Sequence, residues 1–213
     1  MQSFSNSEGS RLLYGMIKAI QSNKQYLSDI DGAIGDGDHG INMNKGFTLC
    51  EKELEENPGD LTHSLNTLSK VLMRDIGGSM GPLYGMFFKS MAKAVASNEI
   101  IDRDLMGEML QAAEQGVRGI GNAEVGDKTL MDALVPAVKA YKKAAAEGKS
   151  FAECAEEMKK AAIAGRDSTM DMVARVGRAS RLGERSRGVL DAGASSCCLI
   201  LMVTADFIIG LEQ

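Results

Sequence analysis

Apolar residues recur along most of this chain at intervals of three and four positions, which is the spacing of one face of an α-helix. Two clear runs are Leu65, Leu68, Leu72 and Ile76, and Leu130, Leu134, Val138 and Tyr141. Alternation with a period of two, which would indicate strands, is scarce. The pattern predicts helices over residues 8–29, 39–56, 61–76, 81–97, 102–120, 129–147, 151–170 and 189–211.

The connections between these helices are mostly short, as at Asn57-Pro-Gly-Asp60 and Glu147-Gly-Lys-Ser150. The prolines all stand near predicted helix starts or turns: Pro58, Pro82 and Pro136. Short connections place successive helices side by side and antiparallel. We therefore predict an all-α fold, an up-and-down bundle of the eight helices above, as a single domain over residues 1–213.

Composition narrows the classes of function. The net charge of −5 argues against nucleic acid as a partner, because a phosphate backbone needs a basic surface. The four cysteines form no Cys-x-x-Cys pair, which is typical of reduced thiols in a cytoplasmic protein. No basic region followed by an apolar run begins the chain. The most apolar segment, Ala192–Leu211, contains Ser195 and Asp206, so we expect a buried core helix and no membrane partner.

The most unusual segment is Asp31-Gly-Ala-Ile-Gly-Asp36-Gly-Asp38-His39-Gly-Ile-Asn42. Glycine and aspartate are poor helix formers, so its three aspartates are expected on a bent loop. Carboxylates held so close repel one another unless a hard cation lies among them, and a set of oxygen ligands suits Mg²⁺ or Ca²⁺ better than zinc. The segment also matches Gly-x-Gly-x-x-Gly, but no strand precedes it and its acids would repel a pyrophosphate. The spacing of an EF-hand is also absent, because Phe47 stands where its glutamate belongs.

Further unusual connections are Gly77-Gly-Ser-Met-Gly-Pro82, residues 121–128 and the arginine-rich run at residues 175–188. In an antiparallel bundle the connections alternate between two ends, so these three share one end with the acidic segment. Together they predict a magnesium–nucleotide site. Backbone amides at the helix start near His39 and in the Gly77–Gly81 turn would bind phosphate oxygens. Arg178, with Arg181 or Arg185, would donate to a transferring phosphoryl group, although an arginine-rich run is also typical of a solvated surface.

Four motifs carry a resemblance to a known family: Asp31-x4-Asp36-Gly-Asp38-His39-Gly-x-Asn42-Met, Gly77-Gly-x-x-Gly81-Pro-Leu-Tyr-Gly85, Gly126-Asp-Lys-Thr129 and Gly-Arg178-Ala-Ser-x-Leu-Gly-Glu-Arg-Ser-x-Gly-x-x-Asp191-x-Gly193. The chain resembles, nearly end to end, the nucleotide-binding (L) subunit of bacterial dihydroxyacetone kinase of the phosphotransferase-system type. The resemblance implies an eight-helix antiparallel barrel with the nucleotide at one end. It also implies two Mg²⁺ ions held by Asp31, Asp36 and Asp38.

The same resemblance implies a set of nucleotide contacts. They fall on His39, Gly40, Ile41, Asn42, Ser79, Met80, Gly121, Leu130, Arg178, Asp191, Ala192 and Gly193. It further implies that ADP stays bound as a cofactor and is converted to ATP by a phosphohistidine-carrying M subunit fed from phosphoenolpyruvate. The ATP then phosphorylates dihydroxyacetone held on a histidine of a separate K subunit. Arg178 is the candidate catalytic residue, and a transcriptional regulator and a second copy of the chain are further candidate partners.

The chain departs from the family pattern at Met80, where a serine is usual, and at Ala192, where a proline is usual. Three alternatives stay open. One is a kinase subunit with freely exchanging ATP, acting on dihydroxyacetone or another short ketose. Another is a nucleotide-sensing regulatory partner without turnover, and the third is a helical Ca²⁺-binding module without nucleotide.

Overall fold

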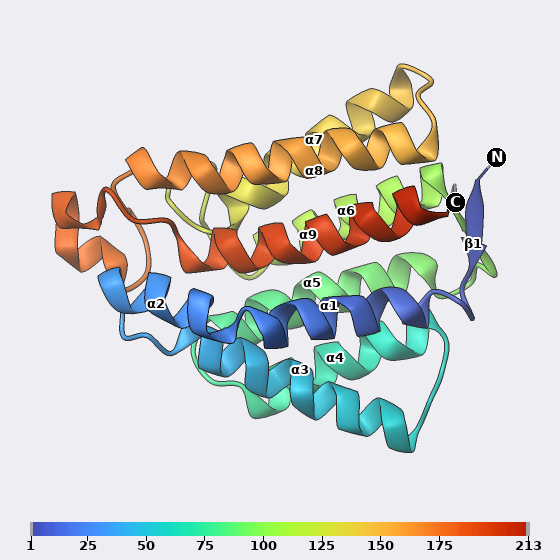
Figure 1. Ribbon diagram of the computed structural model, residues 1–213, viewed down its shortest axis with the longest axis horizontal. Helices are drawn as coiled ribbons and strands as arrows, with labels where there is room; N and C mark the ends of the chain where they lie inside the picture. The colour runs from blue at the N-terminus through green and yellow to red at the C-terminus, as the bar shows by residue number, and fades with distance from the viewer. Residues whose placement is uncertain (1, 212–213) are drawn as a thin grey trace.

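The computed structural model describes residues 2–211, and the long elements of this part of the chain are all helices (Figure 1). The α-helices are α1 (Ser10–Ser22), α2 (Lys24–Ile34), α3 (His39–Glu56), α4 (Leu61–Asp75), α5 (Met80–Val95), α6 (Arg103–Arg118), α7 (Leu130–Ala146), α8 (Phe151–Ser168) and α9 (Ala192–Gly210). Two 3₁₀ helices, η1 (Thr169–Asp171) and η2 (Ala179–Ser186), lie between α8 and α9. The all-α prediction is confirmed.

The first predicted helix, over residues 8–29, is wrong in its bounds. The chain breaks at Asn23, whose side-chain amide donates to the carbonyl oxygen of Ala19 at 2.8 Å. A second helix, α2, then continues to Ile34 and buries Leu27 and Ile34, which are two helical turns apart. Asp31 therefore lies in the last turn of a helix, and not on a bent loop as the sequence predicted.

Two short strands were also missed. The strands β1 (Ser3–Ser5) and β2 (Ile100–Asp102) pair antiparallel, with Phe4 opposite Ile101. Each has three residues, which is too short for an alternating pattern to be recognised. Phe4 packs edge-on against Phe207 of α9, so the strand pair closes the end of the bundle where both described chain ends lie (Figure 1).

Pro136 lies inside α7, although it was expected near a helix start or a turn. Proline lacks the N–H that would bond to the carbonyl four residues earlier, that of Asp132. Gly165 of α8 approaches this carbonyl so closely that a Cβ atom at position 165 would lie 2.1 Å from its oxygen. A glycine therefore permits the close contact of α7 with α8.

One hydrophobic cluster runs through the long helices and includes Leu13, Phe47, Phe88, Leu134 and Leu201. Helix α9 contacts α1, α7 and α8, and it is apolar on all sides. By length and composition α9 could cross a membrane, but 61% of its most apolar window is buried against the other helices. Its position in the core accounts for its composition.

Successive helices run back and forth along the long axis of the molecule, with α1 and α2 following one another in the same direction (Figure 1). The connections after α2, α4, α6 and α8 therefore meet at one end. The strand pair and both ends of the described chain lie at the other. The predicted convergence of the four unusual connections thus agrees with the structure.

Candidate functional site

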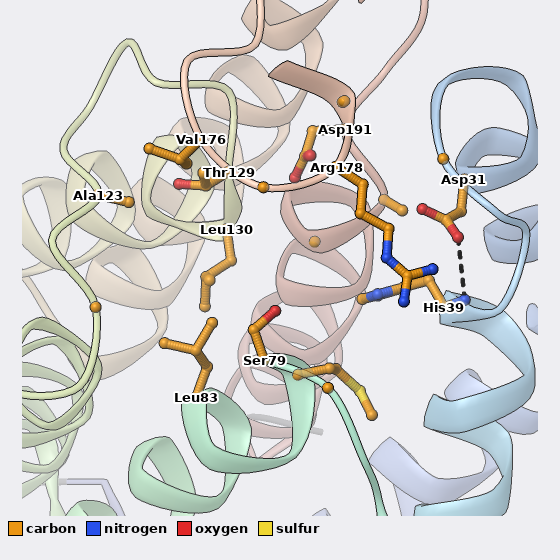
Figure 2. Close-up of a pocket in the computed structure, with 18 of the residues that line it drawn as sticks. Asp31, His39, Ser79, Leu83, Ala123, Thr129, Leu130, Val176, Arg178 and Asp191 are labelled. Atoms are coloured by element: carbon orange, nitrogen blue, oxygen red, sulfur yellow. Dashed lines mark hydrogen bonds between the residues drawn. The ribbon is translucent and has the colours of Figure 1, made fainter. Parts of the chain in front are cut away.

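A cavity of about 410 Å³ opens at the end of the bundle where these four connections meet. Its walls come from the end of α2 and the turn into α3, from the Gly77–Ser79 turn and the start of α5, from the connection before α7, and from residues 176–179 with the start of α9. Segments far apart in the sequence therefore build one site. Figure 2 shows how its labelled side chains lie.

One side of the cavity is acidic. Asp31, Asp36 and Asp38 each offer a carboxylate oxygen, and these oxygens all lie within 4.8 Å of one another. Gly37, with a φ of 76°, makes the turn that brings Asp36 and Asp38 back towards α2. The Asp31 carboxylate also accepts a hydrogen bond from the backbone N–H of His39, at 3.3 Å. A compact set of oxygen donors of this kind fits a hard divalent cation such as Mg²⁺.

Arg178 lies beside this carboxylate cluster. Its guanidinium forms an ion pair with Asp36, and its side chain is 59% exposed, so it remains free to turn towards a bound ligand. The other arginines predicted to share its role lie elsewhere: Arg181 and Arg185 are exposed and do not line the cavity. Among the arginines of this run, only Arg178 lines the cavity within the described residues.

The opposite side of the cavity is apolar. Figure 2 shows Leu83, Leu130 and Val176 gathered across the cavity from Asp31 and Arg178. Val117 and Ala123 add to the same wall. The cavity therefore has a charged side and an apolar side, as a ligand with an anionic group and a flat, weakly polar ring would require.

His39 takes part in a buried hydrogen-bond chain that joins three helices. Its Nε2 lies 2.8 Å from the Ser196 Oγ of α9, and the Tyr84 hydroxyl of α5 lies 2.6 Å from the same Oγ. Tyr84 also donates to the carbonyl oxygen of Gly193 at 3.1 Å. Burial lowers the pKa of His39 to about 4, so its ring is neutral near pH 7. A neutral imidazole held in this way orients the start of α3 and carries no charge for the ligand.

Most of the residues that the sequence singled out line this cavity. They are Asp31, Asp36, Asp38, His39, Asn42, Ser79, Met80, Gly121, Leu130, Arg178, Asp191, Ala192 and Gly193. Gly40 and Ile41 do not. Gly40 is packed against α2, where a Cβ atom would lie 2.1 Å from the carbonyl oxygen of Lys24, and Ile41 is 52% exposed. The absence of a side chain at Gly40 therefore allows α3 to pack closely against α2.

The sequence interpretation missed several lining residues. Leu83, Val117 and Val176 gave no signal, because a single apolar residue in a helix or loop cannot be told from core or surface by periodicity. Tyr84 and Lys128 stood inside recognised motifs but received no role. The signal that could have identified them was a single polar group in an apolar or glycine-rich stretch of sequence.

Asp191 caps the N-terminus of α9 and lines the cavity. Its Oδ2 accepts a hydrogen bond from the N–H of Ala194 at 2.7 Å, and its own N–H donates to the Thr169 hydroxyl at 2.9 Å. Burial raises the pKa of the Asp191 carboxyl to about 7, against the lowering effect of the bond from Ala194. The folded protein thus holds a proton here that an unfolded chain would release above about pH 4.

This pKa predicts how stability depends on pH. Because the folded value of about 7 lies above the value of about 3.9 for an unfolded aspartate, the Asp191 contribution to stability is lost as pH rises between these values. Asp191→Asn keeps a capping acceptor and removes the titration. We expect the variant to match the wild type near pH 4.5 and to gain up to about 3 kcal/mol over it at pH 8. Urea unfolding in the presence of a metal chelator measures this, and an equal difference at both pH values would contradict it.

Comparison with known proteins places the chain in a family. The DAK2 domain family matches residues 33–206. The ADP-binding subunit DhaL of PEP-dependent dihydroxyacetone kinase 1 from Listeria innocua is 41% identical over 182 residues, which cover 85% of this chain and 86% of the relative. The corresponding subunit from Escherichia coli is 36% identical over 190 residues, covering 87% of this chain and 89% of the relative.

Solved structures agree with the fold. The native dihydroxyacetone kinase of C. freundii matches with a TM-score of 0.73 and 20% identity, over 97% of this chain and 35% of that one. The fold is therefore that of a part of this dihydroxyacetone kinase chain. The chain belongs to the DAK2 domain family, and within it to the L subunits of dihydroxyacetone kinases. It is accordingly a kinase subunit of the phosphotransferase type, and the resemblance of the motifs is confirmed.

Proposed function

We propose that this chain is the ADP-binding subunit of a PEP-dependent dihydroxyacetone kinase, acting as one domain over residues 1–213 in the cytoplasm. The observation that carries the proposal is the cavity with two unlike sides. Its volume is about 410 Å³, and three carboxylates and an arginine on one side face an apolar wall on the other. The apolar wall suits an adenine ring, and the charged side suits a diphosphate. The names of the relatives, as ADP-binding subunits, support the same ligand.

The carboxylate cluster supports a role for Mg²⁺. A diphosphate cannot lie beside three carboxylates directly, since like charges about 4 Å apart repel by about 4 kcal/mol at an effective dielectric constant near 20. We infer that Asp31, Asp36 and Asp38 hold two Mg²⁺ ions, which when bound would neutralise charge on the phosphate oxygens. A C. freundii dihydroxyacetone kinase of similar fold is known in complex with AMP-PNP and Mg²⁺.

Other residues of the chain would bind the phosphates and stabilise the transferring phosphoryl group. Backbone amides of the Gly77–Ser79 turn and the start of α5 would donate to phosphate oxygens, because the first amides of a helix have no partner within it. At the start of α3 the N–H of His39 already donates to Asp31. Arg178 would turn from Asp36 to the phosphoryl group in transfer and stabilise its developing charge. Neutral His39 would fix the start of α3 through Ser196 and Tyr84, and no group of the cavity would need to act as a base.

Two further subunits follow from this proposal. A K subunit would hold the ketose and receive the phosphoryl group, and an M subunit would rephosphorylate ADP from the PEP relay. The PEP-dependent relatives support such an assembly. The ketose itself would not touch this chain before transfer. An L-erythrulose kinase of Pectobacterium atrosepticum is 30% identical, although the match covers only 31% of its own length. Another short ketose is therefore the second candidate substrate.

Two measurements test the proposal. The purified protein, denatured after gel filtration, is expected to release one adenine nucleotide per chain. Calorimetry on nucleotide-free protein is expected to show ADP binding that disappears without Mg²⁺. A protein that is purified without nucleotide and binds ATP at millimolar affinity would favour the kinase with freely exchanging ATP. Ca²⁺ binding without nucleotide binding would favour the calcium-binding module. ADP binding without phosphoryl transfer to ketose in the presence of a K subunit would favour the nucleotide sensor.

A further inference from the structure

Lys128 is the one buried lysine among the described residues, with 2% of its surface exposed. Its Nζ donates to the carbonyl oxygens of Ser186 and Val189, each at 2.6 Å, and to that of Met172 at 3.2 Å. No carboxylate of the described chain pairs with it. An ammonium has three hydrogens, so these carbonyls use all of its donors.

The backbone around Lys128 is built to point this side chain inwards. Lys128 has a φ of 64°, and it is the only residue other than glycine with a positive φ in the described chain. This left-handed conformation is disfavoured for a side chain with a Cβ atom and persists only where its surroundings impose it. The buried Asp132 carboxylate imposes it here, because it accepts hydrogen bonds from the N–H groups of Gly126 at 2.6 Å and Thr129 at 2.7 Å.

The three carbonyls belong to the arginine segment, by which we mean residues 172–189. They lie at its two ends, so the ammonium ties the beginning of the segment to its end. The residue before Lys128 adds a second tie, since the carbonyl oxygen of Asp127 accepts a hydrogen bond from the N–H of Arg175 at 3.1 Å. Arg178 lies between these ends, above the cavity (Figure 2).

We propose that Lys128 is a positioning residue: its ammonium holds the arginine segment closed over the cavity and so determines where the guanidinium of Arg178 lies. The consequence for phosphoryl transfer rests on the function proposed above. Lys128 itself does not bind phosphate, because all of its donors are taken by carbonyls. It therefore acts on the reaction through Arg178.

Hydrogen exchange tests the first part without reference to activity. Lys128→Met keeps the length of the side chain and removes its donors. We expect amides in residues 172–189 to exchange at least about tenfold faster, while those of α4 and α5 keep their rates. The matched control is Lys142→Met, which removes an exposed ammonium of α7 that contacts Gln111 and not the segment. Unchanged exchange in the segment of Lys128→Met would overturn the proposal.

Transfer kinetics test the second part. In the assembly with its K and M subunits, Lys128→Met is expected to lower kcat about 100-fold with little change in the affinity for Mg-ADP. In an Arg178→Ala background the same substitution should lower kcat no further. If the two losses multiply instead, Lys128 acts on the ligand directly and the positioning role is excluded.

A second variant keeps the proposal testable if Lys128→Met does not fold. The Ser186 hydroxyl is fully buried, donates to the carbonyl oxygen of Gly183 at 2.7 Å and accepts from the N–H of Ala174 at 2.9 Å. Ser186→Ala loosens the same segment without touching Lys128, so we expect faster exchange there and a smaller loss of kcat that again vanishes in the Arg178→Ala background. Slow exchange in this variant would contradict the proposal. A wild-type assembly without transfer would refute the proposed function, and the exchange result would still decide the role of Lys128.

Discussion

Replacing Asp36 with asparagine is expected to weaken the binding of Mg-ADP by about 100-fold while leaving the helical content unchanged. The substitution removes one negative charge from the carboxylate cluster, and a charge pair about 4 Å apart near a protein surface is worth about 4 kcal/mol. The Asp36 side chain is 43% exposed, so water reduces this figure, and about 3 kcal/mol corresponds to about 100-fold in affinity. The helices do not depend on Asp36, which lies in the turn between α2 and α3.

Calorimetry with ADP and Mg²⁺ measures the loss, and circular dichroism checks the fold. Asp29→Asn is the matched control, since Asp29 is an exposed aspartate of α2 that bonds to Gln25 and lies outside the cavity. It is expected to bind Mg-ADP like the wild type. An Asp36→Asn protein with undiminished affinity would remove the carboxylate cluster from the site.

Arg178→Ala is expected to lower kcat of phosphoryl transfer by about 100- to 1,000-fold, which is the usual loss when one donor to developing charge is removed. Its effect on the affinity for Mg-ADP should be much smaller. In the structure the guanidinium pairs with Asp36, and a metal held by Asp36 as proposed would compete with this pair, so removing Arg178 should cost the bound state little.

The measurement compares kcat with the dissociation constant of Mg-ADP for wild type, Arg178→Ala and Arg181→Ala. Arg181 is an exposed neighbour that does not line the cavity, so its variant should keep the wild-type rate. A loss of affinity for Mg-ADP with kcat unchanged in Arg178→Ala would mean that Arg178 binds the ground state and the transition state equally, and the catalytic role would then be wrong.

The all-α fold and the convergence of the four unusual connections followed from local patterns. Helix period and short connections predicted the antiparallel order, and that order put the four unusual connections at one end. The error in the first helix did no harm, because the break at Asn23 leaves α2 running in the same direction as α1 (Figure 1). Asp31 is helical because α2 buries Leu27 and Ile34 on either side of it. Local helix propensity alone did not indicate this packing.

The rest of the cavity depends on contacts between distant residues. His39 and Ser196 are 157 positions apart, and the three carbonyls bound by Lys128 lie 44 to 61 positions away from it, so no spacing rule joins them. The two departures from the family pattern have local explanations. Met80 packs partly buried against the core, and Ala192 is the first residue of α9, a position that accepts proline but does not require it.

The two ends of the described chain lie at the strand pair, and the cavity lies at the far end of the bundle (Figure 1). A tag, a surface tether or another domain attached through either end would therefore leave the mouth of the cavity clear. Such attachment offers a practical route to immobilise the protein for binding measurements. It is also consistent with the match of this helical unit both to separate subunits over most of their length and to 35% of a larger kinase chain.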